Sequence, residues 1–503
     1  MLKVTCASSF LLVSLAGCAD SARPDAASTT RPPAAAAPGD RDPRNATPHA
    51  QLPRPAAPAT PVNDAPDASP PAAIDAVQTV YRRSDDRPRH DDAALAERGI
   101  HAYESRRLKL YTDIDPDLAR PLPAVIDAAY DEWVRYFGPL PPDREGTEYQ
   151  MTGCIMSDRA LFRETGLLPS DLAEFPNGRH WNARFWMHNQ PFDYYRRHLM
   201  IHEATHCFMT AARSMQGLSP VWYFEGMAEL FGTHRIDPDG TIRFRVMPDN
   251  PGEVADYVRN LGRIEAIQTA VGERRGKSLV AALNIDRGDF SNNEAYAWSW
   301  AVCKLLDAHP AYRERFRRLG EQLTPRAFQY AFSESFDADR SDLGAAWTLF
   351  VHGLQHGFDI ERASVEFRAG TPLVGAERRQ FSVAADRGWQ SSGVRVEAGR
   401  TYVLVATGRV TLAGAPKPWI SEPQGISIRY FRGRPLGQLL ASVRSVADEA
   451  GGDAASMLDV VPIGRGLELE PPVTGTLYLR VNDSWSELAD NQGDFQVEVR
   501  AAE

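Results

Sequence analysis

Two histidines and a glutamate stand close together in the segment L-M-I-H-E-A-T-H-C-F-M, which begins at Leu199. His202 and His206 are four residues apart, so on a helix they lie on one face. Two neutral imidazoles on one face can both bind Zn²⁺. Glu203 lies beside the first histidine and can reach a water at the metal as a general base. The segment therefore predicts a helix that carries a catalytic zinc site.

A second segment, V-W-Y-F-E-G-M-A-E-L-F from Val221 to Phe231, supplies two further carboxylates. Eighteen residues separate His206 from Glu225, enough for a helix end, a loop and the start of another helix. Glu225 is predicted as the third zinc ligand, which leaves a fourth position open for catalysis. Glu229, one turn further along, is placed to accept the other N–H of a ligand histidine. The alternative is a set of core residues placed by chance, but four elements in register favour the metal site.

This HExxH-x18-E pattern, with E-G-M-A-E at its end, resembles the gluzincin metallopeptidases, the thermolysin-like and peptidase-MA group. The resemblance implies an α+β zincin-like domain over residues 76–370, with the two histidines and three glutamates in the roles just described. Related gluzincins often stabilise the oxyanion with a tyrosine on a later helix. By that resemblance Tyr296, which opens Y-A-W-S-W-A-V-C-K-L-L, is the oxyanion donor. A core-facing aromatic side chain is the alternative.

One departure from the family concerns the substrate's amino end. Aminopeptidases with this zinc spacing carry a G-x-M-E-N strand that binds the substrate amine. The nearest segment here, Trp186-Met187-His188-Asn189, lacks the acidic residue. An endopeptidase is therefore predicted.

The surrounding patterns indicate which elements hold these residues. Residues 100–113, 149–157 and 183–189 are predicted as strands, the last at the sheet edge. Residues 118–137 have helical apolar spacing and stop before Gly138-Pro139. After residue 189, helices are predicted to dominate up to about Gly357. Strands followed by helices predict an α+β fold.

After Gly370 the helical patterns stop, and Gly and Pro turns separate short strands, predicted over residues 393–399, 401–407, 427–431, 476–481 and 495–499. Several short strands in this length predict a β-sandwich. The loop N-D-S-W-S-E-L-A-D-N-Q-G, from Asn482, gathers oxygen ligands of the kind that Ca²⁺ takes. Its spacing is not that of an EF-hand, and a polar hairpin loop is the alternative.

This region, residues 371–503, also resembles the galactose-binding bacterial lectins of PA-IL type, through L-Y-L-R-V-N-D and D-N-Q-G-D-F-Q-V-E-V. W-Q-S-S-G-V-R-V-E-A-G, V-A-T-G and P-W-I-S-E-P-Q-G add to the likeness. The resemblance implies a galactose-binding, jelly-roll-like sandwich. Its calcium ligands would be Asp483, Asp490 and Asn491, with carbonyls from Leu412 and Glu487. The lectins' histidine-containing sugar loop is replaced here by Ile-Ser-Ile-Arg (426–429). Calcium binding is therefore expected, while binding of a glycan other than galactose, or packing against the protease region alone, are the alternatives to a galactose site.

The first 75 residues differ from the rest. Lys3, a short apolar run and Leu15-Ala16-Gly17-Cys18 predict a secretory signal over residues 1–17. The tetrapeptide resembles a bacterial lipobox, which implies a lipid on Cys18; a plain signal peptide is the alternative. Residues 18–75 are rich in Ala and Pro and are predicted as a disordered tether. Ala19 after the lipidated cysteine implies the outer membrane or cell surface.

Composition bounds the remaining possibilities. The chain has 503 residues, a formal net charge of −10 and no block of basic residues, so nucleic acid is not an expected partner. Its length allows two to four domains. With Cys18 lipidated, Cys154, Cys207 and Cys303 remain, too few for a disulfide scaffold.

The predicted protein is an envelope-anchored zinc metalloendopeptidase with a calcium-binding, lectin-like region. It would act on proteins or peptides and would contact glycans through its C-terminal part. The alternatives are a glycan-binding surface protein with a vestigial zinc module, and a zinc hydrolase of a non-peptide substrate.

Overall fold

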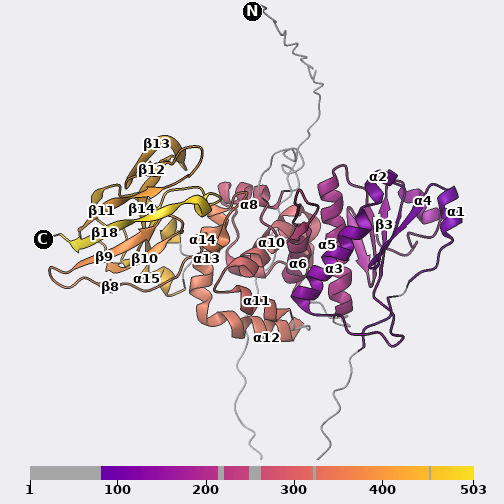
Figure 1. The fold of residues 1–503 in the computed structure, drawn as a ribbon. Helices are drawn as coiled ribbons and strands as arrows, with labels where there is room; N and C mark the ends of the chain where they lie inside the picture. The colour runs from indigo at the N-terminus through magenta and orange to yellow at the C-terminus, as the bar shows by residue number, and fades with distance from the viewer. Residues whose placement is uncertain are drawn as a thin grey trace, which may run out of the picture. The chain divides into compact units, whose positions relative to one another are not determined.

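The protein is α+β, with an all-β C-terminal region, as the sequence predicts (Figure 1). The computed structural model describes residues 81–85, 87–212, 220–248, 262–320, 325–451 and 455–502. All of them belong to one of the two units into which the chain divides, Val77–Glu503. Within these ranges, no helix combines the length and the apolar character that crossing a membrane requires. The predicted signal peptide, the tether and Cys18 lie outside the described residues.

A five-stranded mixed sheet opens the described chain, with its strands in the order β1-β2-β3-β5-β4. Its strands are β1 (His101–Glu104), β2 (Leu108–Thr112), β3 (Met151–Met156), β4 (Gly178–Trp181) and β5 (Arg184–His188). Strands β2, β3 and β5 run parallel, and β1 and β4 pair antiparallel at the two edges.

Two details of the sheet correct the sequence prediction. Residues 100–113 form two strands rather than one, because the chain turns at Ser105, whose N–H bonds to the carbonyl of Leu108. Residues 183–189 contain β5, which is not at the edge: it pairs with β3 on one side and β4 on the other. The strand at this edge is β4, and its sequence Gly-Arg-His-Trp lacks the apolar alternation from which a strand could be predicted.

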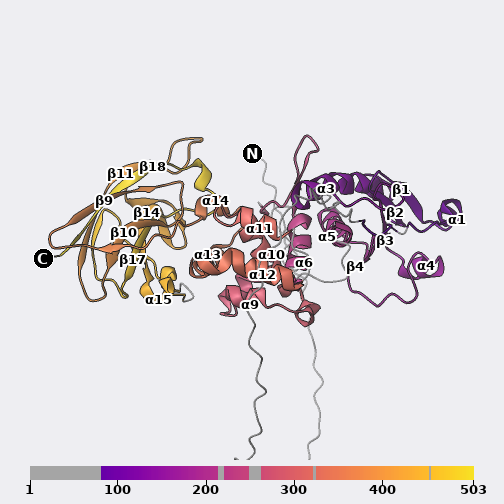
Figure 2. The same ribbon diagram turned by 90° about the horizontal axis from the view of Figure 1, so that it is seen from below.

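The sheet is covered on both faces, as the alternation of buried residues requires. On one face, α3 (Leu122–Phe137) and α5 (Asp193–Ala212) lie side by side and contact the strands (Figure 2). Leu110, Ile155 and Phe185 belong to that core. The opposite side chains, including Tyr111 and Trp186, form a smaller core with residues of the first helices. These helices are α1 (Asp92–Glu97) and α4 (Arg159–Glu164), whereas Ala119 of α2 (Pro116–Ala119) belongs to the larger core.

Helix α3 ends where the sequence predicts, because Gly138 adopts a φ of +85° that stops the helix. After α5 the structure is mainly helical. The helices are α6 (Val221–Gly232), α8 (Arg263–Gly272), α9 (Leu279–Leu283), α10 (Asn293–Ala308), α11 (Arg313–Leu319), α12 (Pro325–Phe336), α13 (Arg340–Gly353) and α14 (Ile360–Ala363). A short hairpin and two 3-10 turns complete this part: β6 (His234–Ile236), β7 (Ile242–Phe244), η1 (Arg287–Ser291) and η2 (Asp337–Asp339).

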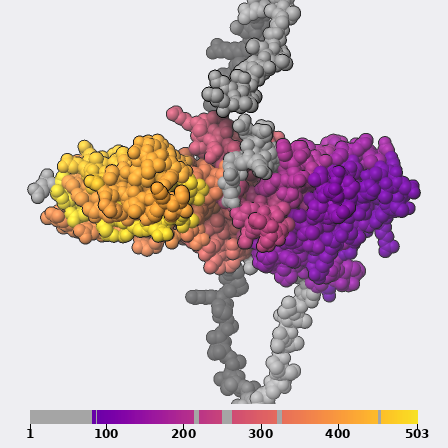
Figure 3. All heavy atoms as spheres, turned by 45° about the horizontal axis from the view of Figure 1, so that its top comes forward, coloured from indigo at the N-terminus to yellow at the C-terminus, as the bar shows by residue number. Residues whose placement is uncertain are grey.

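The C-terminal region contains two sheets that share one hydrophobic core. One has the order β13-β14-β17-β10-β8, and the other β12-β11-β18-β9. The first sheet contains β8 (Thr371–Pro372), β10 (Gln390–Val396), β13 (Gln424–Phe431), β14 (Arg434–Ser445), β15 (Val461–Pro462) and β17 (Gly475–Val481). The second contains β9 (Arg378–Ala384), β11 (Tyr402–Thr411), β12 (Ile420–Ser421), β16 (Gly466–Leu469) and β18 (Gln492–Ala501). Short helical turns lie between the strands: α15 (Val446–Glu449), η3 (Ala455–Leu458) and η4 (Leu488–Asp490). Orange and yellow atoms of this region form one contiguous body in Figure 3.

The helices and the C-terminal strands are joined by a common apolar cluster. Trp389, Tyr478 and Trp485 belong to the same core as the helices, and the Trp485 ring stacks on Phe358 at 5.5 Å. Arg444 Nη1 pairs with Asp342 Oδ1 of α13 at 2.6 Å. The strands therefore pack on the helices with both apolar and charged contacts.

His309, which directly follows α10, is expected to make the folded protein less stable in acid. Burial, and then the charge of Arg315, lower the pKa of His309 from 6.5 to about 4. The unfolded chain binds this proton below pH 6.5 while the folded chain does not, so the free energy of unfolding falls as the pH drops from 6.5 towards 4. His309→Asn keeps an acceptor for the N–H of Ala311, which now bonds to Nδ1 at 3.2 Å, but does not titrate.

The variant should lose less free energy of unfolding than the wild type between about pH 7 and about pH 4.5, by on the order of 2 kcal/mol. Urea unfolding at both pH values measures this difference. His101→Asn, at an exposed position of β1, is the matched control and should behave as the wild type. Equal losses in wild type and His309→Asn would contradict the prediction.

Candidate metal centre

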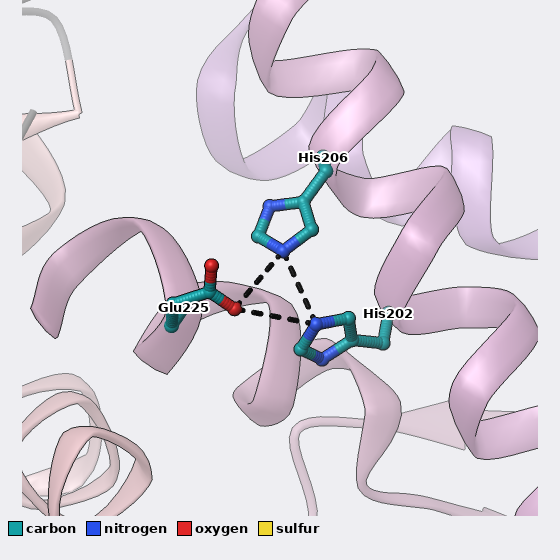
Figure 4. Close-up of side chains that lie close together, drawn as sticks. All are labelled: His202, His206 and Glu225. Carbon is teal, nitrogen blue, oxygen red and sulfur yellow. Dashed lines mark hydrogen bonds and ion pairs between the residues drawn. The ribbon is translucent and has the colours of Figure 1, made fainter. Parts of the chain in front are cut away.

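Helices α5 and α6 bring the three predicted zinc ligands together (Figure 4). The Nε2 atoms of His202 and His206, one turn apart on α5, lie 3.1 Å from each other. Glu225 Oε2, from α6, lies 3.2 Å from His206 Nε2 and 3.4 Å from His202 Nε2. In the part of the chain that the structure describes, this is the one group of three or more His, Cys, Asp or Glu side chains whose ligand atoms converge in this way.

A glycine beside Glu225 brings α6 close to α10. A Cβ on Gly226 would lie 2.5 Å from the carbonyl oxygen of Ser299 and 2.6 Å from Cys303 Sγ, so a larger residue would push the two helices apart. The close approach places Tyr296, near the start of α10, with its ring centroid 6.0 Å from that of His202. The sequence E-G-M-A-E therefore supplies both a ligand and the contact that positions the neighbouring helix.

The three ligand atoms fit a zinc ion. Zinc bonds of about 2.0–2.1 Å in tetrahedral geometry place neighbouring ligand atoms about 3.3 Å apart. The observed separations of 3.1, 3.2 and 3.4 Å match that spacing. Two imidazoles and one carboxylate are also the donor set of a catalytic zinc with one open position.

Glu229 contacts His202, a predicted ligand, at the ring nitrogen that is turned away from the other two. Its Oε1 lies 3.1 Å from His202 Nδ1, which leaves His202 Nε2 to face the other ligands. The carboxylate is 2% exposed and is held by Arg263, through Nε at 2.7 Å and Nη2 at 2.8 Å, and by His198 Nε2 at 3.2 Å. Burial would raise the pKa of Glu229, but Arg263 and His198 outweigh it and hold the pKa well below its usual value.

The ligands respond differently to burial. Burial would lower the pKa of His202, yet its contacts with Glu225 and Glu229 raise it to about 10. Burial lowers the pKa of His206 to about 4, with Glu225 opposing. The two histidines in turn hold the pKa of Glu225 below its ordinary value in spite of burial. The cluster thus keeps a carboxylate and at least one neutral imidazole available to a cation at neutral pH.

Glu203 and Tyr296 lie on one cavity of about 420 Å³ together with the three ligands. Glu203 is 5% exposed, and burial together with the nearby acidic residues raises the pKa of Tyr296 above its ordinary value. Arg263, which holds Glu229, also lies over the Tyr296 ring at 5.5 Å. The structure therefore gathers all five residues predicted for the zinc chemistry at one place.

Sequence reasoning missed several residues that contact the predicted site. His180, on β4, has its ring centroid 4.5 Å from that of His206, with the rings tilted, and its Nδ1 lies 3.5 Å from Glu203 Oε2. Phe224 stacks on His206 at 4.1 Å. Arg263 is 34 residues from Glu229 and belongs to no motif. Of these, only Phe224 had a sequence signal, because it directly precedes the ligand Glu225.

The strand beside the site is also not the one that the sequence pointed to. Residues 186–189 are the nearest match to an amine-binding strand, but they begin within β5, and no residue of β5 lines the cavity. The strand that lines the cavity is β4, with Gly178, Arg179, His180 and Trp181. Strand β4 carries no acidic residue either, so it also lacks a carboxylate that could bind the terminal amine of a substrate.

The predicted calcium ligands lie in the loop after β17. Asp483 and Asn491 are buried, and Asn491 Nδ2 donates to Asp483 Oδ2 at 2.9 Å. Asp490 is exposed at the end of η4, and the side chain of Glu487 pairs with Arg429 at 2.8 Å. Two of the three predicted ligands are therefore in contact, and Asp490 is not turned into the protein. Cys154, Cys207 and Cys303 are free and buried.

No protein-family model matches the sequence, and no curated protein matches it. Among solved structures, the N-terminal domain of EclA, a PllA-like lectin, matches 24% of this chain and 95% of that domain, with 23% identity and a TM-score of 0.20. IMPa from Pseudomonas aeruginosa, in complex with an O-glycopeptide, matches 50% of this chain with 11% identity and a TM-score of 0.15. The match spans 24% of the IMPa chain. At these TM-scores neither likeness bears on the fold or the function.

The geometry predicts one zinc ion per chain, lost in His202→Ala. Glu229→Gln keeps the three ligands but weakens the contact that orients His202, so zinc affinity should fall by about 10- to 100-fold. Competition with a chromophoric chelator measures the affinity, and elemental analysis measures the stoichiometry. Glu361→Gln, at an exposed position of α14, is the matched control. Unchanged zinc affinity in Glu229→Gln would show that this carboxylate does not support the site.

Proposed function

We propose that this protein is a zinc-dependent metalloendopeptidase of gluzincin type, with a zincin-like region built around α5 and α6. The observation that carries the proposal is the convergence of His202, His206 and Glu225 at the spacing of zinc ligands. Glu203 and Tyr296 on the same cavity supply the two groups that hydrolysis needs besides the metal.

Bound zinc would supply a Lewis acid that polarises a carbonyl and makes water more acidic. Glu203 accepts a proton from the attacking water and then passes it to the leaving amine. Tyr296 donates a hydrogen bond to the carbonyl oxygen as negative charge develops there. The raised pKa of Tyr296 supports this role, because it keeps the hydroxyl protonated and able to donate.

The edge strand β4 supports a peptide as the substrate. Within the described residues β4 pairs on one side with β5, and its residues line the cavity. An extended peptide can add to such a free edge through backbone hydrogen bonds. Because β4 offers no carboxylate for a terminal amine, the bond cleaved would lie within the chain rather than next to its end.

Two other functions lead to different experimental results. A zinc hydrolase of a non-peptide substrate would bind zinc and depend on Glu203 but release no new peptide ends. A glycan-binding protein with a vestigial zinc module would show no hydrolysis that depends on Glu203. The intact set of three ligands and a base favours an enzyme, since a decayed site usually loses one of them.

We also propose that the C-terminal region is a lectin-like sandwich that binds calcium at Asp483 and Asn491, with Asp490 turning in from its exposed position as the third ligand. Asn491 Oδ1 is buried and has no hydrogen-bond partner among the described residues, so it is an oxygen free to bind a cation. Burial raises the pKa of the neighbouring Asp483 to about 6, and a cation would offset that cost of burying its charge. Glycan binding by this region follows from the lectin resemblance alone.

The proposed location is the outer membrane or the cell surface. It rests on the lipobox-like Leu15-Ala16-Gly17-Cys18 and on the Pro-rich tether, in which 13 prolines lie between Pro24 and Pro71. Radiolabelled palmitate incorporated into the wild type but not into Cys18→Ser would support the anchor.

Glu203→Gln tests the mechanism. The amide cannot accept the proton of water, so hydrolysis should fall by at least about 10²-fold while zinc stays bound. The measurement is the appearance of new peptide ends in a proteome-derived peptide library, read by mass spectrometry. Glu361→Gln should cleave as the wild type does. Full cleavage by Glu203→Gln would refute the mechanism.

Calcium should raise the melting temperature of the wild type, because a ligand that binds only the folded chain stabilises it. Asp483→Asn replaces a charged ligand by a neutral one and should remove most of that rise. Differential scanning fluorimetry with calcium or with a chelator measures the shift. Asp459→Asn, at an exposed position, should keep the full rise. No calcium-dependent shift in the wild type would exclude the site.

A further inference from the structure

The carboxylate of Glu203 is buried, and a buried charge needs a partner. Within the described residues, the one group in ion-pair contact with it is His180 of β4, whose Nδ1 lies 3.5 Å from Oε2. Hydrogen bonds at active sites are often long without substrate and shorten when the reacting complex forms. His180 is therefore placed to hold one oxygen of Glu203.

Gly178 meets the other oxygen of the same carboxylate. A Cβ at position 178 would lie 2.4 Å from Glu203 Oε1 and 2.9 Å from both Cδ and Cγ. No real Cβ contact is that short, so any larger residue here would displace the Glu203 side chain. Gly178 thus provides the space that the carboxylate occupies.

The pleat of β4 explains why both residues act on Glu203. Alternate residues of a strand point to the same side, so Gly178 and His180 share one side of β4. That side is the half-buried one, whereas Arg179 and Trp181 are exposed. His180 is further fixed by its ring contacts with His206 at 4.5 Å and Phe224 at 5.7 Å.

We infer that Gly178 and His180 are positioning residues that fix the Glu203 carboxylate from the edge strand, one by leaving space for it and the other by holding an oxygen. The inference rests on the proposed role of Glu203 as general base. Strand β4 would then have two roles: its edge binds the peptide, and two of its residues fix the position of the general base Glu203. Neither residue belongs to the group of three ligands, so replacing either should leave His202, His206 and Glu225 in place.

The first test is a series at His180. His180→Phe keeps the ring and removes the donor, and should lower kcat by about 10- to 100-fold with KM and zinc affinity within about threefold of wild type. His180→Asn places an amide N–H near the position of Nδ1 and should restore most of kcat, whereas His180→Gln places it near Nε2 and should not. A purely structural role would not distinguish Asn from Gln. His101→Phe, at an exposed position of β1, is the control.

The second test is Gly178→Ala, with Gly344→Ala as its control, because a Cβ at Gly344 of α13 has no neighbour within 4 Å. Displacement of a base by about 1 Å costs on the order of 10²-fold in rate, so kcat should fall by at least about tenfold. If Gly178→Ala does not fold, as judged by circular dichroism, the His180 series decides alone.

Crystal structures of zinc-loaded Gly178→Ala and His180→Phe provide a measurement that does not depend on activity. Both should show the Glu203 carboxylate moved from its wild-type place while the three ligands stay. An unmoved carboxylate, or kcat within about threefold of wild type in both variants, would overturn the inference. If Glu203→Gln keeps full activity, the proposed function fails instead, and the crystal structures still decide whether β4 positions the carboxylate.

Discussion

The carboxylate of Glu229 is buried, and an unpaired charge in the protein interior is strongly unfavourable. The site depends on how that charge is paired: Arg263 of α8 contacts both of its oxygens, and His198 and His202 of α5 each contact one. Three helices are tied by this one group, since Glu229 itself belongs to α6. Removing one partner of a buried pair typically costs about 3–5 kcal/mol, so the pairing constrains both the fold and the imidazole of His202.

The same constraint explains why α5 is polar and yet buried. From His198 to Met209 every residue of α5 is buried, including two histidines and a glutamate that face the cavity. A helix of this composition would not enter a core on apolar contacts alone. Ion pairs at the cavity, and apolar side chains in the main core such as Ile201 and Phe208, the latter against Tyr130 and Trp133 of α3, together make its burial favourable.

The sequence predicts those parts of the site that lie close together along the chain. The spacing of His202, Glu203 and His206 is set by one helix, and Glu225 and Glu229 by the next, so local periodicity is sufficient to find them. His180 and Arg263 reach the site only through tertiary packing, and the exposed strand β4 lacks apolar alternation. Strand β14 was missed for the opposite reason: it is buried on both faces, because Leu439 faces the other sheet while Leu440 faces the helices, so its apolar residues do not alternate.

The double burial of β14 and β17 has a consequence for whether the two parts of the chain can be separated. One face of these strands completes the core between the C-terminal sheets, and the other, with Leu440 and Tyr478, completes a core that belongs to the helices. A recombination event at residue 370 would therefore transplant half of a core and leave the other half open to water. The two parts differ in composition, yet this shared packing makes each depend on the other for its full burial.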